Sequence, residues 1–125
     1  MADKILIVED NEQNRILMRQ IFTHHGYEVL EAEDGQTGLE MARVHMPDLM
    51  LLDILMPVMN GYQVIRELRG NPEFKSIKVI AVTSCAMKGD REKALEAGFD
   101  EYVIKPIDTR KFPELVKELL SRVQS

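Results

Sequence analysis

Four short, uninterrupted apolar runs constrain the fold of this chain more than any other feature. They cover residues 5–8, 49–52, 79–82 and 102–104, and a weaker run covers residues 27–30. Polar residues do not alternate with apolar ones in them, so strands formed there are predicted to be buried on both faces. This is typical of a parallel sheet covered by helices. A length of 125 residues indicates a single domain.

The segments between the runs carry apolar residues at helical spacing. One such stripe is formed by Phe112, Leu115, Val116, Leu119 and Leu120, and the same spacing recurs around residues 17–22 and 61–68. Three predicted helices run into a glycine that would supply a left-handed closing residue, namely Gly26, Gly70 and Gly98. The predicted N-caps are Asp10 or Asn11 for the first helix and Asp108 for the last.

Strand and helix therefore alternate five times along the chain. Parallel strands are joined by right-handed crossovers, which leaves few possible topologies. The pattern favours an α/β fold with a doubly wound, five-stranded parallel sheet of order 2-1-3-4-5, the flavodoxin-like arrangement.

Composition and charge exclude several classes of function. The formal net charge is −5, which argues against nonspecific nucleic-acid binding. No apolar run approaches the ~20 residues of a membrane helix, and the N-terminus lacks the pattern of a signal peptide. The single cysteine, Cys85, cannot form an internal disulfide, and no obligatory redox role is predicted for it. We expect a cytoplasmic protein without membrane insertion.

Polar residues follow four of the predicted strands at the edge where such sheets bind ligands. They are Glu9 and Asp10, Asp53, Thr83 and Ser84, and Lys105 with Pro106. The first and third strands are neighbours in the predicted order, and they flank the point where the strand order reverses. Glu9, Asp10 and Asp53 are therefore predicted to converge on one small pocket.

Three crowded carboxylates repel one another unless a cation joins them. Oxygen ligands favour Mg²⁺ or Mn²⁺, which would leave room for a phosphate oxygen. With Lys105 as a positive charge at the rim and Thr83 as a hydroxyl donor, these residues predict a site for phosphoryl transfer to a carboxylate. Taken alone, the pair Glu9 and Asp10 fits a helix N-cap or a solvated loop equally well. The histidines are expected to be solvated: His24, His25 and His45.

The chain resembles the receiver domains of two-component response regulators over almost its whole length. The matching segments are residues 5–11 (ILIVEDN), 53–57 (DILMP) with Asn60 and Gly61, 82–83 (VT) and 102–106 (YVIKP). Any one segment is weak evidence, but all of them in this order are specific. The flavodoxin-like strand order is also that of the family, so the order and the resemblance are not independent of each other.

The resemblance implies a role for each residue of the pocket. Asp53 would accept the phosphoryl group, and Asp10 would bind Mg²⁺, with Mn²⁺ as a substitute. Glu9 would bind the metal directly or through water, and the backbone carbonyl of Leu55 would be a further ligand. Lys105 would pair with the phosphate, and its bond to the following proline would be cis.

The resemblance also implies a switch. Thr83 would be the switch hydroxyl and Tyr102 the switch aromatic, and the output would pass through the fourth helix, fifth strand and fifth helix. The protein would be a phospho-acceptor that assists its own phosphorylation and dephosphorylation, not an enzyme acting on other substrates. Its implied partners are a sensor histidine kinase or a phosphotransfer protein, and a downstream protein target.

The segment 84–90 is similar to single-domain receivers of the DivK type and equally to the receivers of hybrid histidine kinases. A chain that starts at Met1 and ends just after its last helix favours the stand-alone form. We therefore expect residues 1–125 to be a receiver domain without an effector domain.

Three other functions are compatible with such an architecture. A flavin-binding electron carrier would need a phosphate-cradling loop after the first strand, where this chain has Glu9 and Asp10. A phosphatase with an aspartyl nucleophile usually has a second aspartate two residues later, where this chain has Leu55. A receiver-like binding module that is never phosphorylated would not need the full acidic set together with Lys105.

Overall fold

A computed structural model describes residues 3–84 and 87–122. Within them the strands are β1 (Lys4–Val8), β2 (Glu28–Ala32), β3 (Leu49–Asp53), β4 (Lys78–Thr83) and β5 (Glu101–Ile104). The helices are α1 (Glu12–His24), α2 (Gly35–His45), α3 (Gly61–Arg69), α4 (Asp90–Ala97) and α5 (Lys111–Ser121), with a short 3₁₀ helix at Pro72–Phe74. Cys85 lies outside the described residues.

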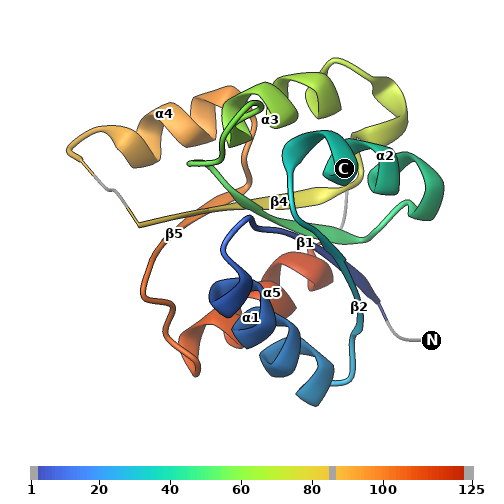
Figure 1. Ribbon diagram of the computed structural model, residues 1–125, viewed down its shortest axis with the longest axis vertical. Helices are drawn as coiled ribbons and strands as arrows, with labels where there is room; N and C mark the ends of the chain where they lie inside the picture. Colours follow the sequence, from blue (N-terminus) through green and yellow to red (C-terminus); the bar gives the residue numbers. More distant parts are fainter. Residues whose placement is uncertain (1–2, 85–86, 123–125) are drawn as a thin grey trace.

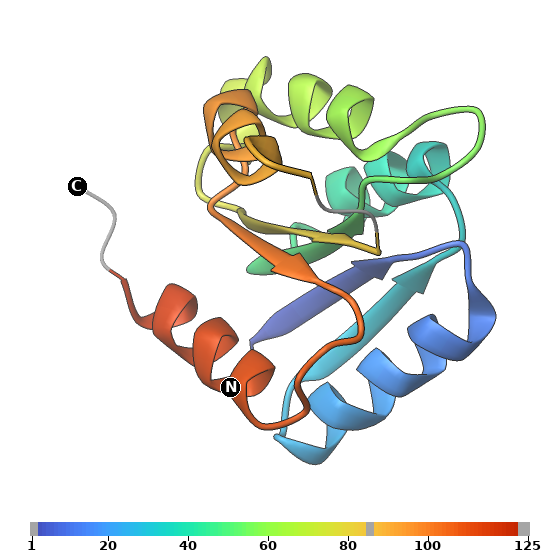
Figure 2. The same cartoon turned by 90° about the vertical axis from the view of Figure 1, so that its left-hand side faces the viewer.

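The strands form one parallel sheet in the order β2-β1-β3-β4-β5, which confirms the predicted topology. Helices α1 and α5 cover one face of the sheet, and α2, α3 and α4 cover the other (Figures 1 and 2). In residues 3–84 and 87–122, no helix has both the length and the apolar character needed to cross a membrane.

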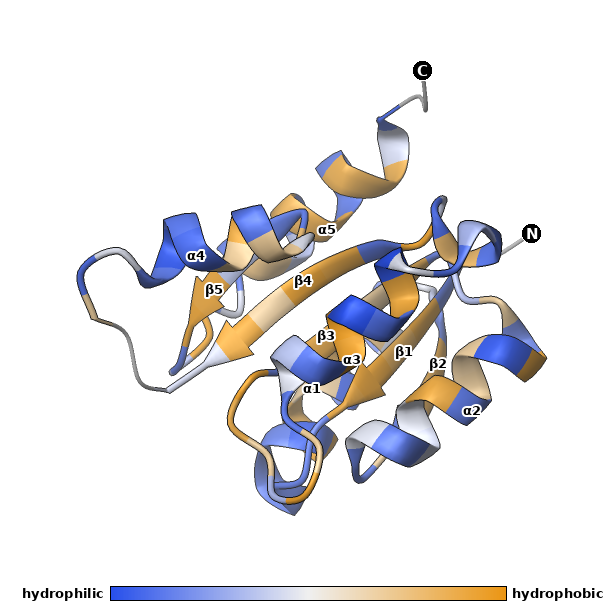
Figure 3. Ribbon diagram, turned by 90° about the horizontal axis from the view of Figure 1, so that it is seen from above, coloured by the Kyte–Doolittle hydropathy of each residue, from blue (hydrophilic) through white to orange (hydrophobic). Residues whose placement is uncertain are grey.

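The uninterrupted apolar runs are explained by two separate hydrophobic cores. Ile5 and Ile7 of β1 pack with α1 and α5, whereas Leu6 and Val8 pack with the helices of the opposite face. Strands β3 and β4 divide their residues in the same way, so their ribbons are apolar along most of their length (Figure 3). Because successive side chains of a strand point to opposite faces, every position of a doubly covered strand must be apolar.

Most helix ends agree with the sequence prediction, but those at Gly70 and Asp108 do not. Asn11 caps α1 by accepting a hydrogen bond from the backbone N–H of Asn14 at 3.0 Å. Gly26 and Gly98 adopt the predicted left-handed conformation, with φ of 89° and 118°. Gly70 does not, because its φ is −77°. The chain continues in a helical turn there, with the N–H groups of residues 70 and 71 bonded back to α3, and then enters the 3₁₀ helix.

Asp108 acts near the start of α5 but is not its capping residue. Its carboxylate accepts hydrogen bonds from the N–H groups of Arg110 and Lys111 at 2.9 and 3.0 Å. Arg110 is the residue that immediately precedes the helix. These two hydrogen bonds lower the pKa of the Asp108 carboxyl.

The start of α3 is packed directly against the end of β3. Asn60 forms a capping box with Gln63, and the N–H of Gly61 donates to the carbonyl of Ile54 at 2.9 Å. A Cβ atom at Gly61 would lie 2.8 Å from the backbone oxygen of Asp53 and 2.7 Å from the Cα of Ile54. Only glycine permits this approach, which fixes the backbone that carries Asp53.

Candidate functional site

Three carboxylates meet at the carboxyl edge of the sheet, as the sequence predicted. Glu9 and Asp10 follow β1, Asp53 ends β3, and these two strands pair in parallel. One oxygen of each carboxylate lies within 4.8 Å of the others. Glu9 is fully buried and Asp53 is only 4% exposed, whereas Asp10 is exposed to solvent. The pocket therefore has two buried acids and one acid at its mouth.

Lys105 reaches further into this pocket than the sequence suggested. Its Nζ lies 2.5 Å from Oε1 of Glu9 and 3.4 Å from Oδ2 of Asp53, and its side chain is 12% exposed. The residue follows β5, where its backbone N–H donates to the carbonyl of Thr83 at 2.7 Å. The Lys105–Pro106 bond is cis, as the resemblance implied. The lysine lies between the two buried acids and not at the rim, because that position brings its ammonium close to two carboxyl groups.

The two buried carboxyls divide their charge unequally. Burial, then the hydrogen bond and the charge of Glu9, raise the pKa of Asp53 to about 7, against smaller opposing effects of Lys105 and the Leu55 amide. Burial acts to raise the pKa of Glu9 too, but contacts with Asp53, with the Lys105 ammonium and with the Asn11 amide lower it. Without a second cation, the pocket therefore takes up one proton, on Asp53, as the pH falls through about 7.

The donor set of this pocket fits a hard divalent cation. All three ligand groups are carboxylates, which Mg²⁺ prefers, and the exposed Asp10 leaves an open side for waters or a phosphate oxygen. Among the described residues, Oε1 of Glu9 receives no well-oriented hydrogen bond despite its close contact with Lys105. A buried carboxylate oxygen with remaining acceptor capacity is a suitable partner for a cation.

The remaining predicted residues lie on the strands and loop around the acids. Asp53 pairs with Val82 of β4, so Thr83 lies one residue beyond it and is 2% exposed. Tyr102 of β5 is half-buried and packs against the core that α2, α3 and α4 cover. The backbone N–H of Leu55 donates to Oδ1 of Asp53 at 3.1 Å, while the Leu55 side chain is 53% exposed. The predicted role of the Leu55 carbonyl stays a prediction.

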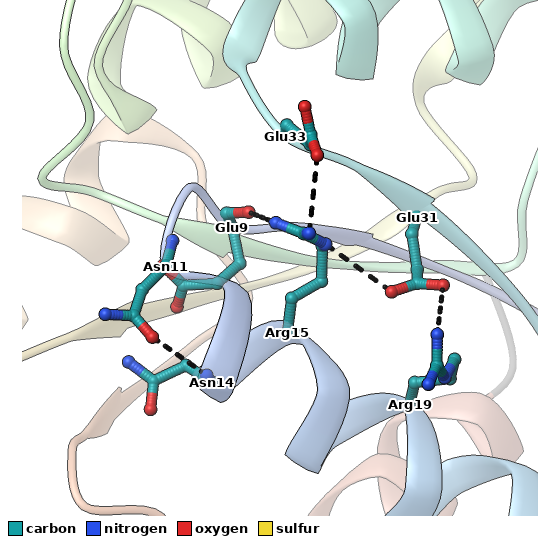
Figure 4. Close-up of polar contacts among 7 residues, drawn as sticks. All are labelled: Glu9, Asn11, Asn14, Arg15, Arg19, Glu31 and Glu33. Atoms are coloured by element: carbon teal, nitrogen blue, oxygen red, sulfur yellow. Dashed lines mark hydrogen bonds and ion pairs between the residues drawn. The ribbon is translucent and has the colours of Figure 1, made fainter.

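Sequence reasoning missed Arg15, which contacts the acidic loop from α1. Its Nη1 donates to the backbone carbonyl of Glu9 at 3.1 Å, and its guanidinium also contacts Glu31 and Glu33 (Figure 4). The only signal in the sequence was an arginine six residues after Glu9, and on its own this spacing is typical of an ordinary solvated helix face.

This fold, with clustered acids and a lysine at the carboxyl edge of the sheet, defines a receiver of two-component signalling. The chain belongs to the family described as response regulator receiver domain, whose sequence profile matches residues 5–117. Receivers of this family act as phospho-acceptor switches and work with histidine kinases and phosphotransfer proteins.

Within the family, the chain is similar to DivK proteins. It is 42% identical to the polar-differentiation response regulator DivK of Brucella anthropi over 120 residues, which are 96% of this chain and 98% of that protein.

Two solved structures agree with this assignment. The receiver domain of a sensor histidine kinase from Pseudomonas aeruginosa, solved with a magnesium ion in its active-site cleft, is 30% identical with a TM-score of 0.89 and covers 98% of this chain and 100% of its own. The receiver domain of a histidine kinase from Syntrophus aciditrophicus is 33% identical with a TM-score of 0.88 and covers 99% of this chain and 96% of its own.

Proposed function

We propose that Asp53 accepts a phosphoryl group in a Mg²⁺-dependent reaction and thereby switches the surface that this chain offers to a protein partner. The observation that carries the proposal is the meeting of Glu9, Asp10 and Asp53 with Lys105 at one edge of the sheet. Such a site combines a carboxylate nucleophile, oxygen ligands for a divalent cation and a fixed positive charge.

In the proposed reaction, a carboxylate oxygen of Asp53 attacks the phosphorus of the donor. The P–N bond of a phosphohistidine breaks, its electron pair stays on the imidazole nitrogen, and an acyl phosphate forms on Asp53. Asp53 must lose its proton before it can attack; the charge of Lys105 favours the ionised form, against the larger effects of burial and of Glu9. Lys105 is then placed to pair with the phosphoryl group, and the hydroxyl of Thr83 to donate to one of its oxygens.

Bound Mg²⁺ would offset the negative charge of the carboxylates and of the incoming phosphoryl group. The residues that would hold it are Glu9, Asp10 and Asp53, together with the backbone carbonyl of Leu55. Mn²⁺ has similar preferences and is proposed as a substitute. The same residues would assist hydrolysis of the acyl phosphate, so the protein would promote its own phosphorylation and dephosphorylation.

Phosphoryl uptake is tested by intact-mass spectrometry after incubation with acetyl phosphate. Wild-type protein should gain one phosphoryl group with Mg²⁺ and none in EDTA, and Asp53→Asn should gain none in either condition. Asp34→Asn is the matched control, because Asp34 is an exposed N-cap and asparagine caps a helix equally well. Labelling in EDTA, or labelling of Asp53→Asn at another residue, would show that the assignment is wrong.

The output surface is proposed to lie on α4, β5 and α5. If Thr83 turns toward the phosphoryl group, it vacates space that Tyr102 on the neighbouring strand can fill, and the exposed surface changes. When two packings are close in energy, a bias of a few kcal/mol can invert their relative populations.

The switch is tested by NMR with beryllofluoride, which stands in for the phosphoryl group. Wild type and Thr83→Ser should show shifts across residues 87–120. Thr83→Ala should bind the mimic but lose most of these shifts. Shifts confined to the Asp53 pocket in wild type would contradict the switch.

The proposed partners are a sensor histidine kinase or a phosphotransfer protein and a downstream protein target, with no direct nucleic-acid contact. Affinity capture with beryllofluoride-treated and untreated protein, compared by mass spectrometry, would identify targets that depend on the switch. The cytoplasmic location and the stand-alone organisation stay predictions. An immunoblot of native protein tests the latter, since a single receiver has a mass of 14.4 kDa.

A further inference from the structure

The backbone of the acidic loop is held from outside the pocket by one side chain. Arg15 extends from α1, is 11% exposed, and donates from Nη1 to the carbonyl of Glu9 at 3.1 Å. Its Nε lies 3.5 Å from Glu31 at the edge strand β2, and its Nη2 lies 3.4 Å from Glu33 just beyond that strand (Figure 4). The guanidinium therefore connects the loop after β1 to the end of β2.

The bond to the Glu9 carbonyl has a particular consequence for the metal ligands. The carbonyl of Glu9 and the N–H of Asp10 belong to one planar peptide group, and the two carboxylates extend from the Cα atoms at its two ends. Holding that carbonyl therefore restrains the backbone from which both carboxylates leave the chain. The N–H of Glu9 is fixed as well, because it donates to the carbonyl of Ala32 at 3.1 Å.

The charge of Arg15 is matched by partners outside the pocket. Glu31 and Glu33 offer two carboxylates to its guanidinium, and Glu31 also pairs with Arg19 at 3.2 Å. What Arg15 gives to the pocket itself is a directed hydrogen bond to a backbone oxygen. The rigid fork of a guanidinium suits this task, since it can donate along several fixed directions at once.

We propose that Arg15 is a positioning residue for the Mg²⁺ site, anchored by Glu31 and Glu33, which orients the Glu9–Asp10 peptide so that its two carboxylates converge on the metal. This inference rests on the proposed function of Glu9 and Asp10 as metal ligands. Groups that orient metal ligands from outside the coordination sphere typically change metal affinity 10–100-fold when they are removed.

A positioning role and simple electrostatics predict opposite changes in Mg²⁺ affinity when Arg15 is removed. Removing a positive charge near an acidic pocket should strengthen the binding of a cation. Losing the orientation of the ligands should weaken it. Arg19 is a matched control, because it lies on the same helix, pairs with the same Glu31, and has no hydrogen bond to the Glu9 carbonyl.

The experiment is an NMR titration of the full chain with Mg²⁺ alone, following the amide signals of residues 9–11 and 53. Arg15→Met should raise the Kd by roughly tenfold. Arg19→Met should leave it within about twofold of wild type or lower it, because its charge is more exposed and screened. The carbonyl ¹³C shift of Glu9 should change in Arg15→Met and not in Arg19→Met.

The conservative variant Arg15→Lys keeps the charge but not the fork, so its Kd and its Glu9 carbonyl shift should both lie between those of wild type and Arg15→Met. If Arg15→Met does not fold, Arg15→Lys and Glu33→Gln give the same test on intact protein, with smaller changes in both quantities. Wild-type affinity in variants whose carbonyl shift has changed would overturn the inference. So would tighter binding by Arg15→Met, or equal weakening by both Met variants. Absence of Mg²⁺ binding by wild type would instead overturn the proposed function.

Discussion

The sheet carries an ionic cluster at each of its two ends, one buried around Glu9 and Asp53 and one partly buried around Arg69 and Asp100, and the clusters differ in how their charges are balanced. At the end remote from the acids, Arg69 of α3 donates to the carbonyls of Phe74, Ile77 and Gly98 and to the carboxylate of Asp100 at 2.9 to 3.2 Å. Asp100 also accepts from the N–H of Val79 at 2.7 Å. One positive and one negative charge meet there, and protein groups satisfy both.

The acidic pocket at the opposite end has no such balance. Three carboxylates face the ammonium of Lys105, and one of the two buried acids has its pKa raised to about 7. The Arg69 cluster joins α3, the 3₁₀ helix and the loop before β5, so we interpret it as a structural tie. The difference agrees with the proposed function, in which the unbalanced charges belong to the reactive site and the completed ones to a structural tie.

The largest effect is expected where a completed cluster is broken. Arg69→Met removes one donor from Asp100 and from each of three carbonyls, and should lower the free energy of unfolding by about 3 kcal/mol. Arg66→Met, on the exposed face of the same helix, should change it by less than about 0.5 kcal/mol. Urea unfolding in EDTA measures both values. Equal effects of the two substitutions would remove the structural side of the comparison.

Neutralising a carboxylate of the acidic pocket should stabilise the protein, whereas breaking the Arg69 cluster should destabilise it. Because the pKa of Asp53 is higher in the folded state than the ordinary value of 3.8, the folded protein binds the extra proton, and metal-free stability should fall as pH rises toward and through about 7. Asp53→Asn should therefore be more stable than wild type at pH 8, on the order of 2 kcal/mol, since the lowered pKa of Glu9 offsets part of the effect.

At pH 5, where Asp53 is protonated in the folded protein, the gain from Asp53→Asn should largely disappear. Asp100→Asn is the contrasting substitution and should destabilise at both pH values, because Asp100 accepts bonds from Arg69 and from a backbone N–H. Thermal and urea unfolding in EDTA across this pH range give the comparison. A constant difference between Asp53→Asn and wild type would contradict the pH argument.

Mg²⁺ should offset the excess negative charge of the acidic pocket and so stabilise the folded protein. A ligand that binds only the folded state at ten times its Kd stabilises it by about 1.4 kcal/mol. The increment should be the same in wild type and in Arg69→Met, because the two clusters share no partners, and it should be greatly reduced in Asp53→Asn. Unfolding with and without Mg²⁺ at constant ionic strength measures it. An unequal increment in Arg69→Met would show that the clusters are coupled.

The smallest change in stability should come from breaking an exposed ion pair. It serves as a reference for the three effects predicted above. Glu118 and Arg122 are one turn apart at the end of α5, 2.9 Å from each other, and both side chains are about half exposed or more. Glu118→Gln should cost less than about 0.5 kcal/mol, and this loss should vanish in high salt. A larger loss would mean that burial is not what separates the clusters from surface pairs.

The fold could be predicted from the sequence because its strongest signal is physical. Residues such as Leu6 and Ile7 must both be apolar when two separate cores cover the sheet, and this pattern is legible without coordinates. The convergence of Glu9, Asp10 and Asp53 followed from the position of the strand ends. The turn at Gly70 was not predictable in the same way, because a 3₁₀ helix follows it and removes the need for a left-handed residue.

Side-chain geometry was the part that the sequence could not provide. The depth of Lys105 in the pocket depends on the conformation of a flexible side chain that contacts two buried acids. The contact of Arg15 with Glu9 depends on the packing of α1 against β2. The Arg69 cluster likewise joins residues about thirty positions apart without a motif. The roles of Thr83 and Tyr102 came from the resemblance and stay predictions.

The carboxylates that anchor Arg15 also bear on a different property of the chain. β2 is an edge strand of the sheet, so one row of its backbone donors and acceptors lies outside the ladder and could pair with a strand of another molecule. Glu28 and Glu31 lie on this strand, and Glu33 follows it. These three carboxylates outnumber Arg15 and Arg19, the arginines that pair with them, so two molecules approaching through this edge would bring a net negative charge together. The same acidic residues should therefore oppose aggregation by edge-to-edge pairing at high protein concentration.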